Sequence, residues 1–158
     1  MKIFPSKDLK FKLLDSKEES IERLKRRTEI SEKLTSSITD KSFRGILKDD
    51  EFKIISSEIG KGALCVMTGK IDNEKSYVNV EINKTFRILF SIILVMPIVA
   101  LIIETVKEPN DFLFFILIGI CQILMFRFFF LGLIFSIMSR QSLNRLRDVL
   151  DIEFTNKN

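Results

Sequence analysis

Two long apolar runs dominate the second half of the chain. The first, residues 86–103, has 18 residues, and as a helix it would be roughly 27 Å long, close to the hydrocarbon core of a bilayer. The second, residues 112–138, has 27 residues and would extend over roughly 40 Å, more than one crossing needs. A chain of 158 residues has too little other material to bury two such helices. The pattern therefore predicts a transmembrane hairpin.

An acidic segment between the two runs sets the limits of this hairpin. We expect the hairpin over residues 85–138, with spans at about residues 86–104 and 112–134 and an outer loop at residues 104–111. The loop contains three acidic side chains and one Lys, whereas basic residues border the hairpin toward the two ends of the chain: Lys84, Arg87, Arg140, Arg145 and Arg147. By the positive-inside rule, both termini should face the cytoplasm.

The second run carries two polar side chains, Gln122 and Arg127. An Arg at the centre of a bilayer is costly, but near the headgroups a long side chain can reach water at little cost. In a hairpin centred on the loop, residues whose numbers add up to about 215 lie at equal depth, so Arg127 should be level with Ile88. This depth favours an interface position for Arg127, close to Arg87. The alternative is that Arg127 and Gln122 face a polar pathway or a partner subunit.

Residues 1–84 have the patterns of a small α+β module, which is expected to remain in the cytosol. Residues 9–14 alternate enough to form a strand. Ser16 and Glu19 have the spacing of a capping box, which predicts a helix from Lys17 to about Thr28. Four β-like segments bounded by turn residues follow, at residues 43–48, 52–56, 63–71 and 76–83. The expected fold class is α+β: a strand, a helix and an antiparallel four-strand meander, followed by the hairpin.

One glycine within the first of the four segments, Gly45, is expected to mark a bulge or a close approach of two backbones.

Residues 139–158 are expected to form a C-terminal amphipathic helix and a short cytosolic tail. On a helical wheel four apolar side chains fill one sector, flanked by Arg140, Arg145 and Arg147; the four are Leu143, Leu146, Val149 and Leu150. Such a stripe fits a helix that lies on a membrane surface with its Arg side chains among the headgroups. It fits equally well a helix that docks on the sheet of the module itself.

Composition limits the chemistry. The chain has no His and two Cys, Cys65 and Cys121, so Ser/His and Cys/His nucleophile pairs and His-containing zinc sites are excluded. The one dense acidic cluster, residues 49–51, is expected at the tip of a hairpin as a solvated turn. The sequence predicts no enzyme, no catalytic residue, no metal site and no cofactor, and it assigns no ligand-binding residue.

The net charge of +4 does not indicate nucleic-acid binding. A basic cluster at Arg23, Lys25, Arg26 and Arg27 is interleaved with acidic residues on the same expected helix, as on a solvated face with ion pairs. Aromatic residues that could stack on bases are missing from it. The expected partners are the lipid bilayer and a protein, either a different one or a second copy bound through the spans.

Three short motifs accompany this order of elements: Phe43-Arg-Gly-Ile-Leu, Phe52-Lys-Ile-Ile and Thr68-Gly-Lys-Ile71. With the alternating strand and the hairpin that follow, the chain resembles a set of small bacterial membrane proteins that have two spans and an N-terminal cytosolic α+β module. The resemblance covers most of the chain. It implies this architecture and a place in the bacterial cytoplasmic (inner) membrane, and it implies no activity and no site residue.

The leading functional hypothesis is a membrane-anchored cytosolic module that binds a partner or senses a ligand. A first alternative is an oligomeric membrane-perturbing or channel-like effector that the module controls. A second is an immunity protein that packs its spans against a membrane-acting toxin. The candidate residues for membrane-interface or subunit contacts are Arg87, Gln122, Arg127, Arg140, Arg145 and Arg147.

Overall fold

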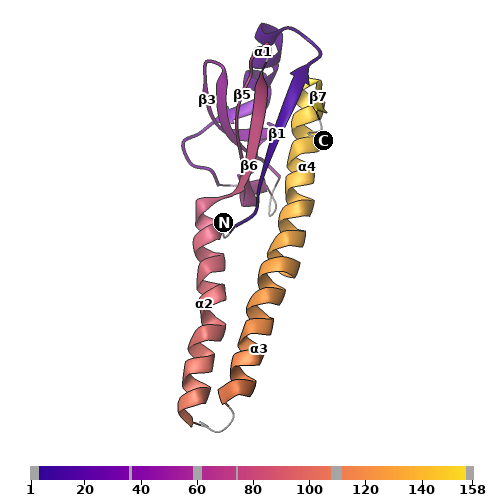
Figure 1. Ribbon diagram of the computed structural model, residues 1–158. Helices are drawn as coiled ribbons and strands as arrows, with labels where there is room; N and C mark the ends of the chain where they lie inside the picture. Colours follow the sequence, from indigo (N-terminus) through magenta and orange to yellow (C-terminus); the bar gives the residue numbers. More distant parts are fainter. Residues whose placement is uncertain (1–3, 36, 59–61, 74, 108–111, 156–158) are drawn as a thin grey trace. The chain divides into compact units, whose positions relative to one another are not determined.

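The computed structural model describes residues 4–35, 37–58, 62–73, 75–107 and 112–155 (Figure 1). The chain divides into two compact units. Met1–Asn83 and Phe135–Asn158 form the first, here named the sheet unit, and Lys84–Ile134 form the second, the helical unit. A sheet combined with long apolar helices confirms the mixed α+β class.

Within the described residues, the sheet has seven strands in the order β2-β3-β4-β5-β6-β1-β7. Strands β3 to β6 form an antiparallel meander, which confirms the prediction for this region. Strand β1 is antiparallel to both β6 and β7, whereas β2 is parallel to β3. The strands are β1 (Ser6–Leu13), β2 (Thr28–Ile30), β3 (Phe43–Lys48), β4 (Glu51–Ser56), β5 (Cys65–Lys70), β6 (Ser76–Ile82) and β7 (Ile152–Thr155).

The two edge strands, β2 and β7, were not predicted from the sequence. Helix α1 (Lys17–Arg27) ends where Thr28 turns to an extended conformation, and the three residues of β2 follow directly. Strand β7 follows Asp151, whose φ of 49° lies in the left-handed region that ends many helices. Strands of three and four residues are too short for a clear alternation of polar and apolar residues.

The start of β5 also differs from the prediction. The segment expected to be extended from residue 63 begins with a 3-10 turn, η1 (Gly62–Leu64), and the strand itself begins at Cys65. A side chain at Gly62 would collide with the carbonyl oxygen of Ser56, since its Cβ would lie 1.8 Å from that atom. The chain therefore passes close to the end of β4 at a position where only a glycine fits.

One face of the sheet carries the core of the sheet unit. Alternate strand residues point to the same face, and the buried ones include Phe11, Phe43, Phe52, Ile54, Met67, Val78, Val80 and Ile82. Leu24 of α1 is buried as well, together with residues of α4 (Gly132–Leu150): Phe135, Leu143, Leu146 and Leu150. Three of the four residues of the C-terminal apolar stripe are thus buried within the sheet unit, which favours docking on the sheet over a position on a membrane surface.

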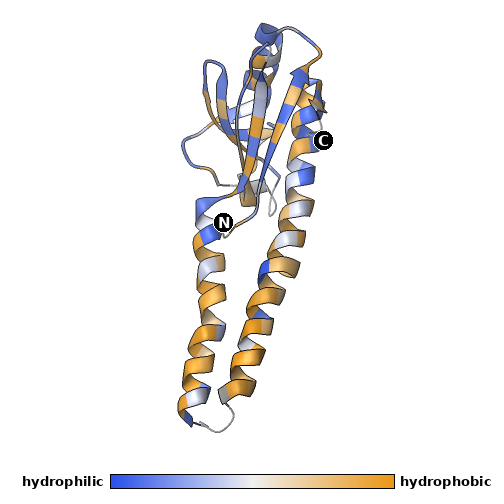
Figure 2. Cartoon of the chain, in the orientation of Figure 1, coloured by the Kyte–Doolittle hydropathy of each residue, from blue (hydrophilic) through white to orange (hydrophobic). Residues whose placement is uncertain are grey.

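The helical unit contains α2 (Lys84–Lys107), α3 (Phe112–Leu124) and the π-helix η3 (Met125–Leu131), which continues into α4. Two helical stretches, Lys84–Lys107 and Leu113–Leu150, are long and apolar enough to cross a membrane. Figure 2 shows hydrophobic residues along almost the whole length of α2 and α3. The expected outer loop begins later than predicted, because α2 extends to Lys107; the rest of that loop lies outside the described residues.

Helices α2 and α3 pack against each other within this unit. At Gly119 of α3 a Cβ would lie 2.1 Å from the Cδ1 atom of Leu101, so the absence of a side chain permits the close approach. Further along, the ring centroids of Phe90 and Phe126 lie 6.4 Å apart. The numbers of this pair add up to 216, which agrees with the equal-depth register expected from the sequence. Arg127 therefore lies beside the first turns of α2 and not beside its middle.

Candidate functional site

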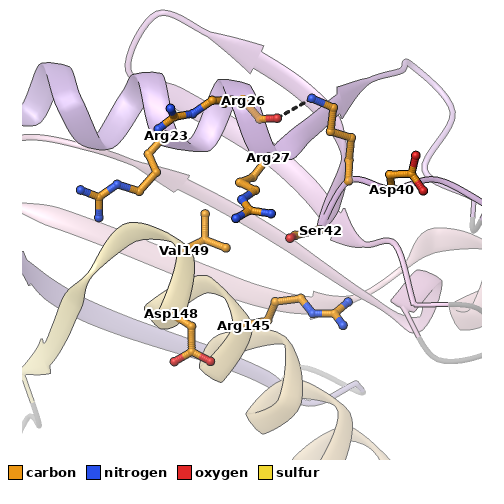
Figure 3. A pocket seen from close by; sticks show the side chains of 9 residues that line it. Arg23, Arg26, Arg27, Asp40, Ser42, Arg145, Asp148 and Val149 are labelled. Atoms are coloured by element: carbon orange, nitrogen blue, oxygen red, sulfur yellow. Dashed lines mark hydrogen bonds between the residues drawn. The ribbon is translucent and has the colours of Figure 1, made fainter.

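A pocket of about 720 Å³ opens in the sheet unit, where α1 ends. It is lined by residues of α1, of the segment before β3 and of α4: Arg23, Arg26, Arg27, Asp40, Lys41, Ser42, Arg145, Asp148 and Val149 (Figure 3). Five of these side chains are cationic and two are anionic, which gives a formal charge of +3. We name it the basic pocket. A positively charged concave site of this size suits an anionic ligand.

Local sequence explains why three Arg side chains of α1 reach the basic pocket. The Ser16 hydroxyl accepts a hydrogen bond from the Glu19 N–H at 3.3 Å, so α1 begins at Lys17 as the capping box predicted. From this start, Arg23, Arg26 and Arg27 stand at positions i, i+3 and i+4, which lie on one side of a helix. The cluster that looked like a solvated face is thus in part the wall of a pocket.

Arg23 is the most strongly paired of these side chains. Its guanidinium bonds to Asp15 at 2.7 Å and to Glu19 at 3.2 Å, and it also pairs with Asp151, just after α4. The hydrogen bond that Arg23 donates to Asp15 raises the pKa of Arg23, and burial opposes this effect only in part. Arg23 therefore links α1 to the end of α4, and its charge is already balanced within the fold.

The remaining cations of the basic pocket keep more of their hydrogen-bonding capacity. Lys41 Nζ donates to the backbone carbonyl of Arg26, and Arg145 Nη1 donates to Ser56 Oγ at 2.8 Å. Among the described residues, no carboxylate forms an ion pair with Arg26 or Arg27. Arg26, Arg27 and the unused N–H groups of Arg145 can therefore bind an anion from solution.

The six residues singled out from the sequence are divided between the two units. Arg140, Arg145 and Arg147 belong to the sheet unit, where Arg145 lines the basic pocket and Arg147 lies 3.7 Å from a carboxylate oxygen of Asp148. Arg140 is exposed on α4. The other three, Arg87, Gln122 and Arg127, belong to the helical unit.

Arg127 stands in the π-helix η3, surrounded in sequence by Phe residues. Its guanidinium carbon lies 5.9 Å from the ring centroid of Phe128, which is within the range of a cation–π interaction. A π-helix within an α-helix often coincides with a functional position. The sequence identified Arg127 as unusual but gave no sign of the change in helix type.

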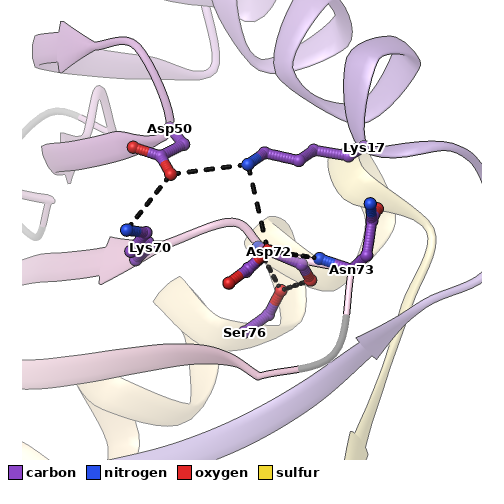
Figure 4. A network of polar contacts seen from close by, with 6 residues as sticks. All are labelled: Lys17, Asp50, Lys70, Asp72, Asn73 and Ser76. Atoms are coloured by element: carbon purple, nitrogen blue, oxygen red, sulfur yellow. Dashed lines mark hydrogen bonds and ion pairs between the residues drawn. The ribbon is translucent and has the colours of Figure 1, made fainter.

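A second polar cluster lies where α1 begins (Figure 4). Asp50 Oδ2 lies 3.4 Å from Lys17 Nζ and 3.3 Å from Lys70 Nζ, and Lys17 Nζ is also 3.9 Å from Asp72. The cluster connects the first turn of α1 to the β3–β4 turn and to the end of β5. Asp50 is therefore part of an ion-pair network and not simply a solvated turn residue as expected. Among the residues that the structure describes, no group of acidic residues or thiols has an arrangement suited to a metal ion.

The network gives a pH-dependent contribution to stability. Burial tends to raise the pKa of the Asp50 carboxyl, but the hydrogen bond and charge of Lys70, with the hydrogen bond from Lys17, outweigh it and hold the pKa below its usual value. A lowered folded-state pKa stabilises the fold above the unfolded-state pKa, and this contribution disappears as the pH falls through the folded value.

We expect Asp50→Asn to lower the midpoint of thermal unfolding at neutral pH by a small amount that shrinks below about pH 4. The fluorescence of Tyr77, the single Tyr of the chain, can follow unfolding over this pH range. Asp49→Asn removes a neighbouring exposed carboxylate and serves as the control. An equal effect of the two substitutions, or a difference that does not change with pH, would contradict the role of the network.

Cys65 is the one thiol in the described part of the sheet unit, and it is fully buried in β5. Burial raises the pKa of this thiol to about 12. Since the thiolate is the reactive form, Cys65 should not react with maleimides while the sheet is folded. It can therefore report when the sheet opens.

Comparison with protein-family models, with curated proteins and with solved structures finds no match for this chain.

Proposed function

We propose that this chain is an integral protein of the bacterial cytoplasmic membrane, in which the helical unit anchors a cytosolic sheet unit that binds a ligand or partner. The exposure of α2 carries the proposal. In the most apolar stretch of 18 residues of this helix no residue is buried. The side chains of Ile88, Ile92, Met96 and Ile102 are each more than half exposed. A continuous apolar surface of this length is not stable in water. A lipid bilayer would cover it.

The dimensions and charges of the helical unit support a membrane crossing. The 24 residues of α2 have a length of roughly 36 Å, which is enough to cross the hydrocarbon core. Arg127 lies beside the first turns of α2, where Lys84 and Arg87 also stand. All three side chains would then be at the level of the cytoplasmic headgroups, where Arg and Lys are favourable.

The sheet unit has features of a binding module. It has its own core and a positively charged pocket that faces solvent. The chain has no His, and the thiol of Cys65 is buried and protonated, so the usual nucleophile–base pairs cannot form there. These features favour recognition over catalysis.

Cysteine labelling in cells tests the anchor and its orientation. In a chain with Cys65→Ala and Cys121→Ala, a new Cys is placed at the exposed position Lys12 in β1 or at Lys107 at the end of α2. We expect a membrane-impermeant maleimide to label Lys107→Cys in intact cells, and to label Lys12→Cys only after the membrane is permeabilised. The protein should also stay in the membrane fraction after an alkaline carbonate wash.

Release of the protein by carbonate would show that it is not an integral membrane protein. The opposite labelling pattern would show that the termini lie on the outer side, contrary to the positive-inside rule.

A further inference from the structure

We infer that the basic pocket is the binding site of the sheet unit and that its ligand is a small anion with at least one phosphate group. This inference rests on the proposed function, because it names the ligand class of the binding module.

Donors on two sides of the basic pocket suit a phosphate group. Figure 3 shows Arg27 on the α1 side and Arg145 on the α4 side, with the Ser42 hydroxyl between them. A guanidinium is planar and can give two parallel N–H bonds to phosphate oxygens. Of the five N–H donors of Arg145, one is used by Ser56. Two guanidinium groups and a hydroxyl are therefore available to one anion.

The internal contacts leave this positive charge uncompensated. Arg23 is balanced by three carboxylates, but Arg26 and Arg27 form no ion pair with a described residue. Basic residues in the last turn of a helix do stabilise its dipole, which gives Arg26 and Arg27 a structural role in α1. That role does not explain why Lys41 and Arg145, from two other segments, are directed to the same pocket. Like charges that converge repel one another, and a bound anion relieves the repulsion.

The C-terminal end of α1 carries positive charge, which favours a negatively charged ligand. The free carbonyl groups at the end of a helix carry partial negative charge, which would repel an anion. Lys41 donates a hydrogen bond to the carbonyl of Arg26 and so places a positive charge on this end. Arg26, Arg27 and Lys41 thus present a positive surface where an uncapped helix would present a negative one.

Size and lining indicate that the ligand is more than a phosphate ion. A volume of about 720 Å³ lies in the usual range of sites for small organic ligands, about 300–1,000 Å³. Val149 adds an apolar wall, and the carboxylates of Asp40 and Asp148 can accept hydrogen bonds from hydroxyl or amino groups. A phosphate ester whose body carries such groups, of the size of a nucleotide, fits this combination.

Calorimetric titration of the full-length protein in phosphatidylcholine nanodiscs tests the site. The probes are adenosine triphosphate and pyrophosphate. The pocket variant is Arg27→Gln/Arg145→Gln, and the control is Lys12→Gln/Arg140→Gln, which removes the same charge from exposed positions outside the pocket. We expect the pocket variant to bind at least one probe about tenfold more weakly than the wild type, because two charge-assisted contacts are lost. The control should bind nearly as well as the wild type.

A phosphate ester can also come from a lipid headgroup. Native mass spectrometry of protein from nanodiscs with equal parts of phosphatidylcholine and phosphatidylglycerol distinguishes this source. If neither soluble probe binds, but the wild type retains phosphatidylglycerol and the pocket variant does not, the phosphate belongs to the lipid. If the pocket variant and the control behave alike in both experiments, the inference is overturned, and the cysteine-labelling result for the membrane anchor still stands.

A folding defect must not be mistaken for lost binding, since Arg145 also bonds to Ser56. Arg27→Glu provides a second variant, because Arg27 is exposed and forms no ion pair with a described residue. It reverses one charge in the pocket and should abolish binding. The midpoint of thermal unfolding, followed by the reactivity of the buried Cys65 thiol, should fall by only a few degrees, because a Glu in the last turn of α1 is unfavourable for the helix dipole. Unchanged binding by Arg27→Glu would also overturn the inference.

Discussion

Replacement of Leu146 by Ala should lower the free energy of unfolding of the sheet unit by about 2–5 kcal/mol. Leu146 has no exposed surface, and its neighbours one turn away in α4, Leu143 and Leu150, are buried as well. Protein cores are closely packed. Truncation therefore removes buried apolar surface and leaves a cavity that the surrounding side chains fill only in part.

Labelling of Cys65 during heating measures this effect. In a Cys121→Ala chain, a maleimide dye should react only when the sheet opens, because Cys65 is buried and its thiol is protonated. For a unit of this size, the midpoint should fall by roughly 8 °C or more. Leu14→Ala is the matched control, since Leu14 is 60% exposed in the same unit, and its effect should stay within about 0.5 kcal/mol.

Leu146→Ala and Leu14→Ala also distinguish the two interpretations of the C-terminal helix, which are docking on the sheet and a position on a membrane surface. A helical wheel shows that Leu143, Leu146 and Leu150 share a side, but a lipid surface and a protein core are both apolar and the pattern cannot distinguish them. If Leu146→Ala is no more harmful than Leu14→Ala, the stripe does not pack in the core, and the membrane-surface interpretation is correct.

How much of the fold the sequence predicts depends on the length of each element. The meander of β3 to β6 was predicted because its segments of six or seven residues are bounded by turn residues, and the last of them alternates clearly. The edge strands β2 and β7 are instead fixed by bonds to distant parts of the chain. The Ser31 N–H donates to the Gly45 carbonyl at 2.9 Å, and the Leu14 N–H donates to the Asp151 carbonyl at 3.2 Å. Local propensity does not contain these long-range contacts.

The hairpin and the basic pocket also differ in how far they could be predicted from the sequence. The position of Arg127 beside the first turns of α2 could be predicted because the register of two helices around a short loop has a single free parameter, and the contact between Phe90 and Phe126 fits the predicted register. The basic pocket combines α1 with Arg145, which lies more than 100 residues away in the chain. The i, i+3, i+4 spacing of Arg23, Arg26 and Arg27 was the available signal, and it gave one wall of the pocket but not the other.

Replacement of Gly45 by Ala should be about as damaging as the loss of a core side chain. Gly45 has a φ of 154°, and a Cβ on it would lie 2.2 Å from the Lys53 carbonyl oxygen and 2.8 Å from the Ile54 Cα. The structure thus confirms the close approach expected from the sequence. Both atoms belong to the backbone of β4, so neither can move away without disturbing the pairing of β3 with β4. We expect a loss of about 2–4 kcal/mol from overpacking and backbone strain.

Gly132→Ala provides the contrast, because a Cβ at Gly132 has no neighbouring atom within 4 Å. This residue lies at the start of α4, where Ala is a better helix former than Gly by up to about 1 kcal/mol. The midpoint of thermal unfolding, measured by labelling of Cys65, should therefore fall clearly for Gly45→Ala and stay level or rise for Gly132→Ala. Equal midpoints would mean that β3 does not approach β4 this closely at Gly45. The pairing of Gly45 with Ile54 would then be wrong, and β3 and β4 would have a different register. A shift of the register by one residue would turn Phe43 and the other side chains of β3 to the opposite face of the sheet.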